Sequence, residues 1–275
     1  MNRKQNIKEN AMRKIISVFL LAAAVITGAS AATAQAASVT AVATADISAD
    51  SSTGSSVALP AITIAEQAAG DIAEGAFVLS LPAGFAFDAS SIANVAATGA
   101  GLAASSTVSF TDAGHAAVTV TATSTEAGSI TVGSVVPLKV KAAAGTPLAA
   151  GNITLSSGAI AGLAATTSLG TLTEISGAPA KLAFTAQPSA SVQVGSVFST
   201  STVAVKDQFG NTVTSDNGRA IGLTVIPVSP ATTTGALGGN TSASTASGTA
   251  IFGNLTFSVP GVIQLQANAS GLASV

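Results

Sequence analysis

Apolar and polar residues alternate with a period of two along most of the chain after residue 37. In residues 262–268, for example, Ile263, Leu265 and Ala267 point to one face and the two glutamines between them to the other, and residues 118–122 alternate likewise. Successive side chains of a strand point to opposite faces of a sheet, so this pattern is typical of half-buried strands. Further strands are expected at residues 38–47, 57–66, 76–81, 107–111, 130–135, 138–141, 152–156, 181–187, 201–207, 221–227 and 250–258.

Turn-forming residues separate these segments, whereas apolar stripes with the period of a helix are missing. In the alanine-rich residues 96–104 a short helix remains the alternative. Short strands between such turns predict an all-β fold made of antiparallel β-sandwiches. The turns are Pro82-Ala83-Gly84, Asp112-Ala113-Gly114, Gly145-Thr146-Pro147 and Asp216-Asn217-Gly218.

The amino-terminal segment has the pattern of a secretory signal peptide, which we assign to residues 1–36. Five basic residues precede an apolar run at residues 15–26, and small residues follow it, so we expect cleavage after Ala36, with Ala31 as the second site. Met12 is an alternative start. An uncleaved anchor helix is the alternative reading, but this run is shorter than the ~20 residues that span a bilayer.

A boundary in the mature chain falls near Ser176-Gly177-Ala178-Pro179. Residues 37–176 are expected to form one sandwich and residues 180–275 a second, joined by a linker at residues 177–179. Because Pro179 stiffens this short linker, we expect a semi-rigid tandem.

The second sandwich carries a spaced set of motifs and resembles the bacterial immunoglobulin-like repeats of invasin- and intimin-type surface proteins. One departure is Ile263, where many such repeats have an aromatic residue. The resemblance implies an immunoglobulin-like fold. The matching residues are Lys181-Leu182-Ala183-Phe184, the run from Val203 to Asn211, Gly235 to Gly239, Gly248 to Phe252 with Leu255, Gly261 to Ala267, and Gly271.

Only Leu272 to Val275 follow the turn at Gly271, so we expect this module to lack its last strand. Two explanations stay open. The sequence is a piece of a longer protein, or a neighbouring subunit completes the sheet by strand addition, with residues 38–45 as the candidate donor.

The motif from Asp207 to Gly210 suits a type I turn, with Asp at its first position and Gly at its fourth. Phe209 within it is expected to close an open end of the sandwich, and an exposed aromatic for a ligand is the alternative. Phe252 and Leu255 are expected in the core rather than in a binding stripe.

Residues 61–66 and 77–85 look like the β-sandwich modules of bacterial surface-layer and cohesin-like proteins. Pro82 would end a strand there, and Gly84 would permit a positive φ. This resemblance implies adhesion, scaffolding or carbohydrate binding and brings no matched ligand residues.

Composition then excludes several classes of function. Charged residues make up 8% of the chain, and there is one His and no Cys, Trp or Tyr. These numbers argue against a thiol nucleophile, a metal cluster or an aromatic sugar platform. After signal removal, five basic residues face eleven acidic ones, so nucleic acid is not an expected partner.

Two clusters hold candidate chemistry. His115 follows Asp112, and a Ser–His–Asp triad can be drawn, but no Gly-x-Ser-x-Gly motif accompanies it and a solvated turn histidine is the preferred reading. The cluster of Glu66, Asp71 and Glu74 could bind calcium. It lacks the spacing of an EF-hand, however, so an ordinary acidic loop is the preferred interpretation. We therefore predict no catalytic, cofactor-binding or metal-binding residue, and the sequence identifies no ligand-binding residue.

The sequence thus predicts a secreted protein of the bacterial cell surface, a structural or adhesin component acting as a stalk, spacer or surface-assembly element. A module that binds glycan or protein through residues 37–176 is one alternative. A filament or surface-layer subunit that assembles by strand complementation is the other. Its partners would be cell-envelope or extracellular proteins or glycans, or copies of itself, with no membrane span after signal cleavage. An enzyme is not expected.

Overall fold

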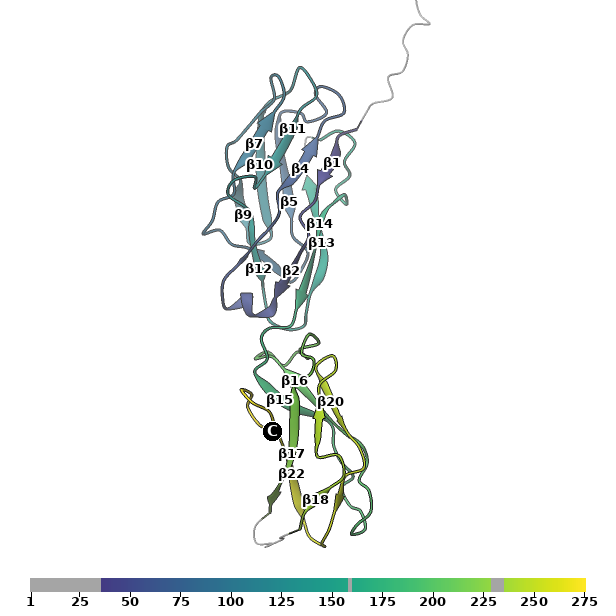
Figure 1. Cartoon of the computed structure of the whole chain (residues 1–275). Helices are drawn as coiled ribbons and strands as arrows, with labels where there is room; N and C mark the ends of the chain where they lie inside the picture. Colours follow the sequence, from purple (N-terminus) through teal and green to yellow (C-terminus); the bar gives the residue numbers. More distant parts are fainter. Residues whose placement is uncertain (1–35, 158–159, 229–234) are drawn as a thin grey trace, which may run out of the picture.

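The computed structural model describes residues 36–157, 160–228 and 235–275, and most of its regular structure is β-strand. Two groups of strands lie end to end, and the chain passes once from one to the other (Figure 1). We call residues 36–176 the N-terminal half and residues 180–275 the C-terminal half. Within the described ranges the one helical segment is the 3-10 helix η1 (Ala49–Ser52), and no helix there has the length and apolarity needed to cross a membrane.

The N-terminal half contains a four-stranded, a seven-stranded and a small three-stranded sheet. In pairing order, the first is β1 (Ser38–Ala41), β4 (Ile62–Ala65), β11 (Ser129–Val132) and β7 (Val95–Thr98). The second is β2 (Ala45–Ser48), β14 (Ser168–Ile175), β13 (Ala150–Ser157), β5 (Gly75–Ser80), β10 (His115–Ala122) and β8 (Ala103–Ala104), with β9 (Ser109–Asp112) also on β10. The third is β3 (Val57–Ala58), β12 (Lys139–Ala142) and β6 (Phe85–Phe87).

One core fills the space between these sheets. Phe77 and Leu79 of β5 are fully buried in the same cluster as Ile64 of β4 and Ile130 of β11, which belong to the other large sheet. Side chains from two sheets that meet in one core are the mark of a β-sandwich. The clusters of buried apolar residues stop at the boundary between the halves, so each half has a core of its own.

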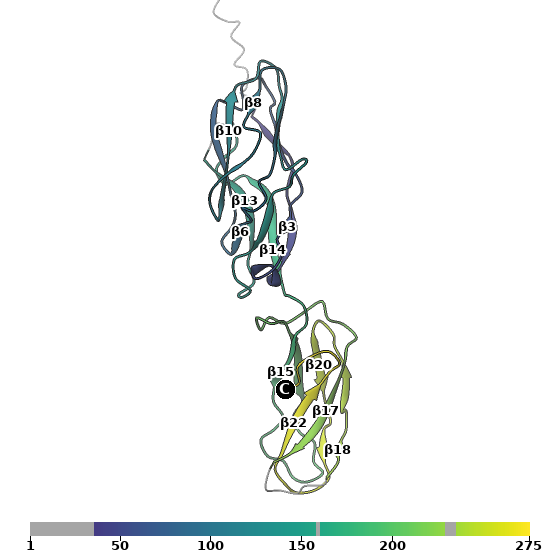
Figure 2. The same cartoon turned by 90° about the vertical axis from the view of Figure 1, so that its left-hand side faces the viewer.

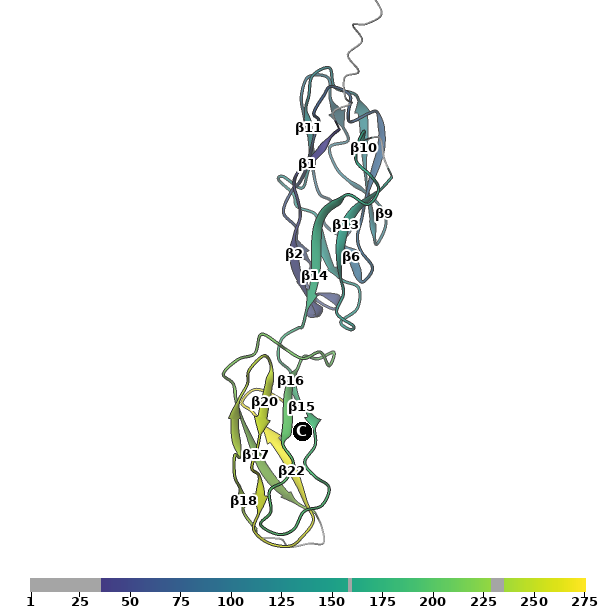
Figure 3. The ribbon, with the colours of Figure 1, turned by 90° about the vertical axis from the view of Figure 1, so that its right-hand side faces the viewer.

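The C-terminal half is also a packing of sheets, and Figures 2 and 3 show its strands running along the same axis as those of the other half. Its core includes Phe252, Val203 and Leu223, one from each of three strands. Its sheets are β15 (Lys181–Ala186), β16 (Ser201–Lys206) and β20 (Thr249–Phe252); β19 (Ser242–Ser244), β17 (Ala220–Pro227) and β22 (Ile263–Asn268); and β18 (Leu237–Gly238) with β21 (Thr256–Phe257).

The predicted all-β class is confirmed, and the alternation that predicted it is visible in the burial of side chains. In β10, Val118 and Val120 are buried while Thr119 and Thr121 are exposed. Phe252 and Leu255 are fully buried, as predicted. One strand pair departs from the antiparallel expectation, because β2 runs parallel to β14.

Several predicted strands are shorter or divided in the structure. Pro60 separates β3 from β4, since a proline cannot donate to the ladder, and Asn254, with φ 57°, separates β20 from β21. Residues 96–104 hold most of β7 and all of β8 instead of a helix. Six strands were not predicted: β6, β7, β8, β14, β18 and β19.

The hypothesis that residues 38–45 act as a free donor strand is wrong for this structure. Within its own half, β1 pairs with β4, and the backbone N–H of Ala43 donates to the carbonyl of Leu169 at 2.8 Å. Ala43 is fully buried. Release of this segment would break its strand pairing and expose the core, so it is not free to pair with a neighbouring subunit. The predicted signal peptide, apart from Ala36, lies outside the described residues.

The adjacent residues Phe252 and Ile251 offer a test of the C-terminal core, because one is fully buried and the other is 62% exposed. Phe252→Ala should lower the free energy of unfolding of this half by about 3–5 kcal/mol, through lost burial and the cavity left behind. Urea unfolding followed by far-ultraviolet circular dichroism measures the change. Ile251→Ala is the matched control and should change stability little; equal losses in both variants would contradict the assigned packing.

Candidate functional site at the joint between the halves

His115 and Asp112 lie at the tip of the β9–β10 hairpin, where Nδ1 of His115 is 2.7 Å from Oδ1 of Asp112. Both side chains are well exposed, at 43% and 60%. The hydrogen bond from His115 and the one from the backbone N–H of Gly114 lower the pKa of Asp112. Among the described residues no serine is bonded to His115, and the pair is a solvated turn rather than a triad.

The carboxylates considered for calcium are used otherwise. Glu66 accepts hydrogen bonds from the backbone N–H groups of Ile72 (3.0 Å) and Gly128 (2.8 Å), and Asp71 accepts from two N–H groups of its own loop. Glu74 is exposed. In the part of the chain that the structure describes, no three acidic or histidine side chains gather closely enough to hold a metal ion.

The most developed polar cluster outside the cores lies where the two halves meet (Figure 1). It joins η1, the loop after β12 and the end of β14 in the N-terminal half to the turn after β16 in the C-terminal half. We call this cluster the joint and define it by Asp50, Gly145, Glu174, the linker at 177–179, and Asp207 to Asn211.

Asp50 binds both the linker and the C-terminal half. Its Oδ2 accepts from the backbone N–H of Ala178 at 2.7 Å, and its Oδ1 accepts from Nε2 of Gln208 at 2.8 Å. The position of Asp50 is set by η1, which Ser48 caps by accepting from the N–H of Asp50. One carboxylate thus bridges segments that are 158 residues apart in the chain.

Asp207 is the most buried charged group of the joint, with no exposed surface. Its carboxylate accepts from the backbone N–H of Gly177 (2.9 Å), the N–H of Asn211 (2.8 Å) and the side-chain amide of Asn211 (2.9 Å). Burial alone would raise the pKa of Asp207, but these hydrogen bonds, with one involving Gly210, outweigh it and lower the pKa. The predicted turn is confirmed, since the N–H of Gly210 donates to the carbonyl of Asp207.

The turn also touches the N-terminal half directly. Nδ2 of Asn211 donates to the carbonyl of Gly145 at 2.6 Å, and the ring of Phe209 lies against the same glycine. A Cβ on Gly145 would come within 2.2 Å of that ring. Phe209, expected to close an open end of its sandwich, is half-buried at the joint and packs against the other half.

A second glycine allows the linker to approach Asp50. A Cβ on Gly177 would lie 2.2 Å from Oδ1 of Asp50, well inside van der Waals contact. Gly177 is buried, and its N–H is the donor to Asp207. The linker therefore passes between two carboxylates, one from each half, and donates a backbone hydrogen bond to each.

Glu174 adds a second buried carboxylate from the end of β14, at 4% exposure. Its Oε2 accepts from the N–H of Ala149 at 2.9 Å, and no described residue donates to its Oε1. Burial raises the pKa of Glu174; the bond from Ala149 opposes this rise, and the negative charge of Asp207 across the joint adds to it. The two carboxylates thus have pKa values displaced in opposite directions.

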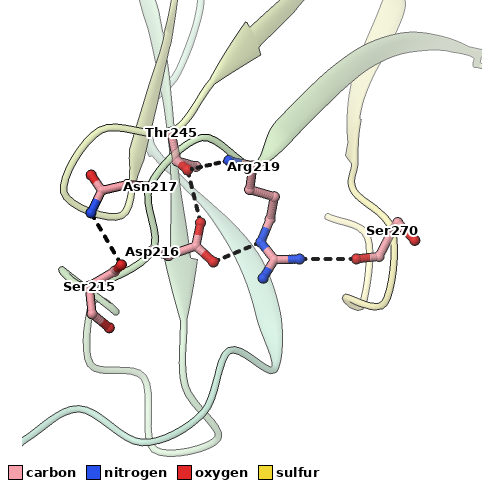
Figure 4. A network of polar contacts seen from close by, with 6 residues as sticks. All are labelled: Ser215, Asp216, Asn217, Arg219, Thr245 and Ser270. Carbon is pink, nitrogen blue, oxygen red and sulfur yellow. Dashed lines mark hydrogen bonds and ion pairs between the residues drawn. The ribbon is translucent and has the colours of Figure 1, made fainter.

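A separate network fixes the start of β17 and the turn after β22 within the C-terminal half (Figure 4). Asp216 accepts from Nε of Arg219 and from Oγ1 of Thr245, both at 2.8 Å, and Nη1 of Arg219 donates to the carbonyl of Ser270 at 3.2 Å. These bonds hold the turn after β22 to the start of β17. They involve no bound group and explain the sequence Asp216-Asn217-Gly218 as a structural turn.

Sequence reasoning found part of the joint. The linker and the Asp207–Gly210 turn carried visible signals, a Gly-Ala-Pro boundary and a turn motif. Asp50, Gly145 and Glu174 were missed, and the cap pattern at Ser48 was the one local signal that could have drawn attention to Asp50. Among the residues that define the joint, no nucleophile is paired with a general base; the contacts observed there are hydrogen bonds that connect the two halves.

Comparison with known proteins gives little guidance. No protein-family model matches the chain, and no curated protein matches it. One solved structure to which it is similar is FdeC, described as a broadly conserved adhesin of Escherichia coli, with 16% identity and a TM-score of 0.27 over 87% of this chain. The chain spans 61% of that structure. Because this identity and this TM-score are low, the comparison carries no argument about the fold, and the fold assignment rests on the strand pairing described above.

Replacement of Asp207 by Asn tests the charged hydrogen bonds of the joint. Asp207→Asn should lower the free energy of unfolding at pH 7 by about 2 kcal/mol, the usual scale for hydrogen bonds to a charged group. Because the folded pKa of Asp207 lies below the unfolded value of about 3.9, its stabilisation is present above that pH and is lost as pH falls through the folded pKa. The difference between wild type and variant should therefore shrink in acid, as urea unfolding from pH 7 downward would show.

Asp46→Asn is the control for this test, since Asp46 is an exposed carboxylate on β2. It should leave stability nearly unchanged at pH 7. A loss in Asp207→Asn that stayed constant into strong acid would show that the charge of Asp207 is not the stabilising feature.

Proposed function

We propose that this chain is a secreted protein of the bacterial cell surface in which two β-sandwich modules, residues 37–176 and 180–275, form a stiff spacer of an adhesin or surface assembly. The observation that carries the proposal is the joint. Asp50 and Asp207 each hold the linker, and Gln208 and Asn211 each donate across to the N-terminal half. A linker held in this way resists bending, whereas a free linker of this length would allow the modules to reorient.

The other features agree with a mechanical role. Each half has its own core, so each can keep its shape under load while the joint sets their relative direction. The residues considered for catalysis or calcium binding include His115, which is hydrogen-bonded to Asp112 within a turn, and Glu66, which accepts hydrogen bonds from backbone N–H groups of loops. Secretion follows from the predicted signal peptide, with cleavage after Ala36. A glycan- or protein-binding role of residues 37–176 is the alternative, which a pull-down confined to that module would favour.

Small-angle scattering of the chain from Ala37 onward tests the spacer. The wild-type chain should give one narrow distribution of extended shapes. Asp50→Ala with Asn211→Ala removes bonds from both sides of the joint and leaves both cores intact, so the distribution should broaden toward bent shapes. Asp46→Ala is the matched control. A wild type as broad as the double variant would refute a stiff joint.

The cellular location has its own test. Brief protease treatment of intact cells that produce the full chain should release its peptides, while a cytoplasmic marker protein stays protected. Amino-terminal sequencing of the mature protein should give Ala37, or Ala32 if the second cleavage site is used. Retention of the uncut chain inside the cells would contradict secretion without bearing on the joint.

A further inference from the structure

The two buried carboxylates of the joint differ in how well they are hydrogen-bonded. Both oxygens of Asp207 accept hydrogen bonds, from the backbone N–H groups of Gly177 and Asn211 among others. Glu174 is 4% exposed, and its Oε2 accepts from the N–H of Ala149, but its Oε1 is buried and no described residue donates to it. A buried carboxylate with an oxygen left unbonded is costly in its charged form, and protonation removes that cost.

Glu174 also lies where the charge of the other half reaches it. It is the last residue but one of β14, which runs directly into the linker (Figure 3). Burial raises the pKa of Glu174 above its usual value of 4.5, the hydrogen bond from Ala149 opposes the rise, and the negative charge of Asp207 adds to it. Asp207 belongs to the C-terminal half, so this repulsion between the two carboxylates exists only while the halves are in contact. A charged Glu174 therefore favours opening of the joint, and a protonated Glu174 does not.

The other charged groups on the elements around Glu174 either bind elsewhere or point away from it. Those on β2 and β12 alternate with buried residues and so face the opposite side of their strands. Those with other partners are Asp50 (with Ala178 and Gln208), Lys181 (with the carbonyl of Gln208) and Lys206 (with Thr212), and those that point away are Asp46, Lys139 and Lys141. Asp207 is thus the charged residue that acts on Glu174.

We propose that Glu174 makes the joint respond to pH, so that the two halves are held together more firmly when Glu174 is protonated than when it is charged. The proposal rests on the spacer role proposed above and adds the condition under which the spacer is stiffest. It makes the proton the ligand of the joint, and Oε1 of Glu174 the atom that binds it.

The direction of the effect follows from the displacement of the two pKa values. Because the pKa of Glu174 is raised in the folded protein, the stabilisation that its protonation brings is complete below pH 4.5 and is lost as pH rises through the raised value. The pKa of Asp207 is lowered from 3.8, since its hydrogen bonds outweigh the effect of burial, so Asp207 keeps its charge in mild acid. The linker should therefore be held most firmly in mildly acidic solution, where Glu174 is neutral and Asp207 is still charged.

Hydrogen exchange at the linker tests this inference on the chain from Ala37. The N–H of Gly177 donates to Asp207, so its protection factor, corrected for the intrinsic dependence of exchange on pH, measures how often the joint opens. Between pH 7 and about pH 5 this protection should rise by about threefold or more, within the limit of about tenfold per pH unit that one proton sets. A chelator is included so that no metal ion takes the place of the proton on Glu174.

Two variants assign the effect to the pair of carboxylates. Glu174→Gln keeps the shape of the side chain without its charge, so it should show the higher protection already at pH 7 and lose the dependence on pH. Asp207→Asn removes the facing charge, so its protection should be lower throughout and the ratio between the two pH values should shrink. Glu126→Gln is the matched control, because Glu126 is an exposed carboxylate outside the joint, and it should behave as the wild type.

The outcomes separate this inference from the spacer role. Protection of Gly177 that is high and equal at both pH values would overturn the inference and leave the stiff joint intact. A dependence on pH that persists in Glu174→Gln would also overturn it, since another group such as His115 would then be responsible. A Gly177 N–H that is unprotected at every pH would refute the spacer and the inference together. If Glu174→Gln failed to fold by circular dichroism, the wild-type pH dependence and the ratio in Asp207→Asn would still decide.

Discussion

The structure depends on buried carboxylates that accept hydrogen bonds from backbone N–H groups; Asp216, which is paired with Arg219, is the exception. Asp207, fully buried, accepts from Gly177 and Asn211, and Glu66 accepts from Ile72 and Gly128. A chain with 8% charged residues has few lysines and arginines with which to pair its acids. Backbone donors are available everywhere, and a carboxylate that accepts several of them is stable in its charged form. Each such group fixes the loop whose N–H groups donate to it.

This mode of fixing loops needs close approach of the main chain, which the small residues of this sequence permit. At the joint, Gly145 receives the Phe209 ring and Gly177 passes beside Asp50, and a Cβ at either place would collide. Small side chains therefore do more than fill the surface, because they let a loop of one half lie directly on a turn of the other. In the proposed spacer, stiffness between the modules would come from short polar contacts, in place of a large apolar interface.

The sequence predicts a strand correctly where apolar and polar residues alternate along it without interruption. In β10 the valines face inward and the threonines outward, so the period of two is plain. In β14 the rule fails, because Gly170 interrupts the alternation and Glu174 faces inward where an apolar residue is expected. The Asp207–Gly210 turn could be predicted, since its bonds are local. The partners of Asp50 lie 128 and 158 residues away, and no local pattern reveals contacts of that separation.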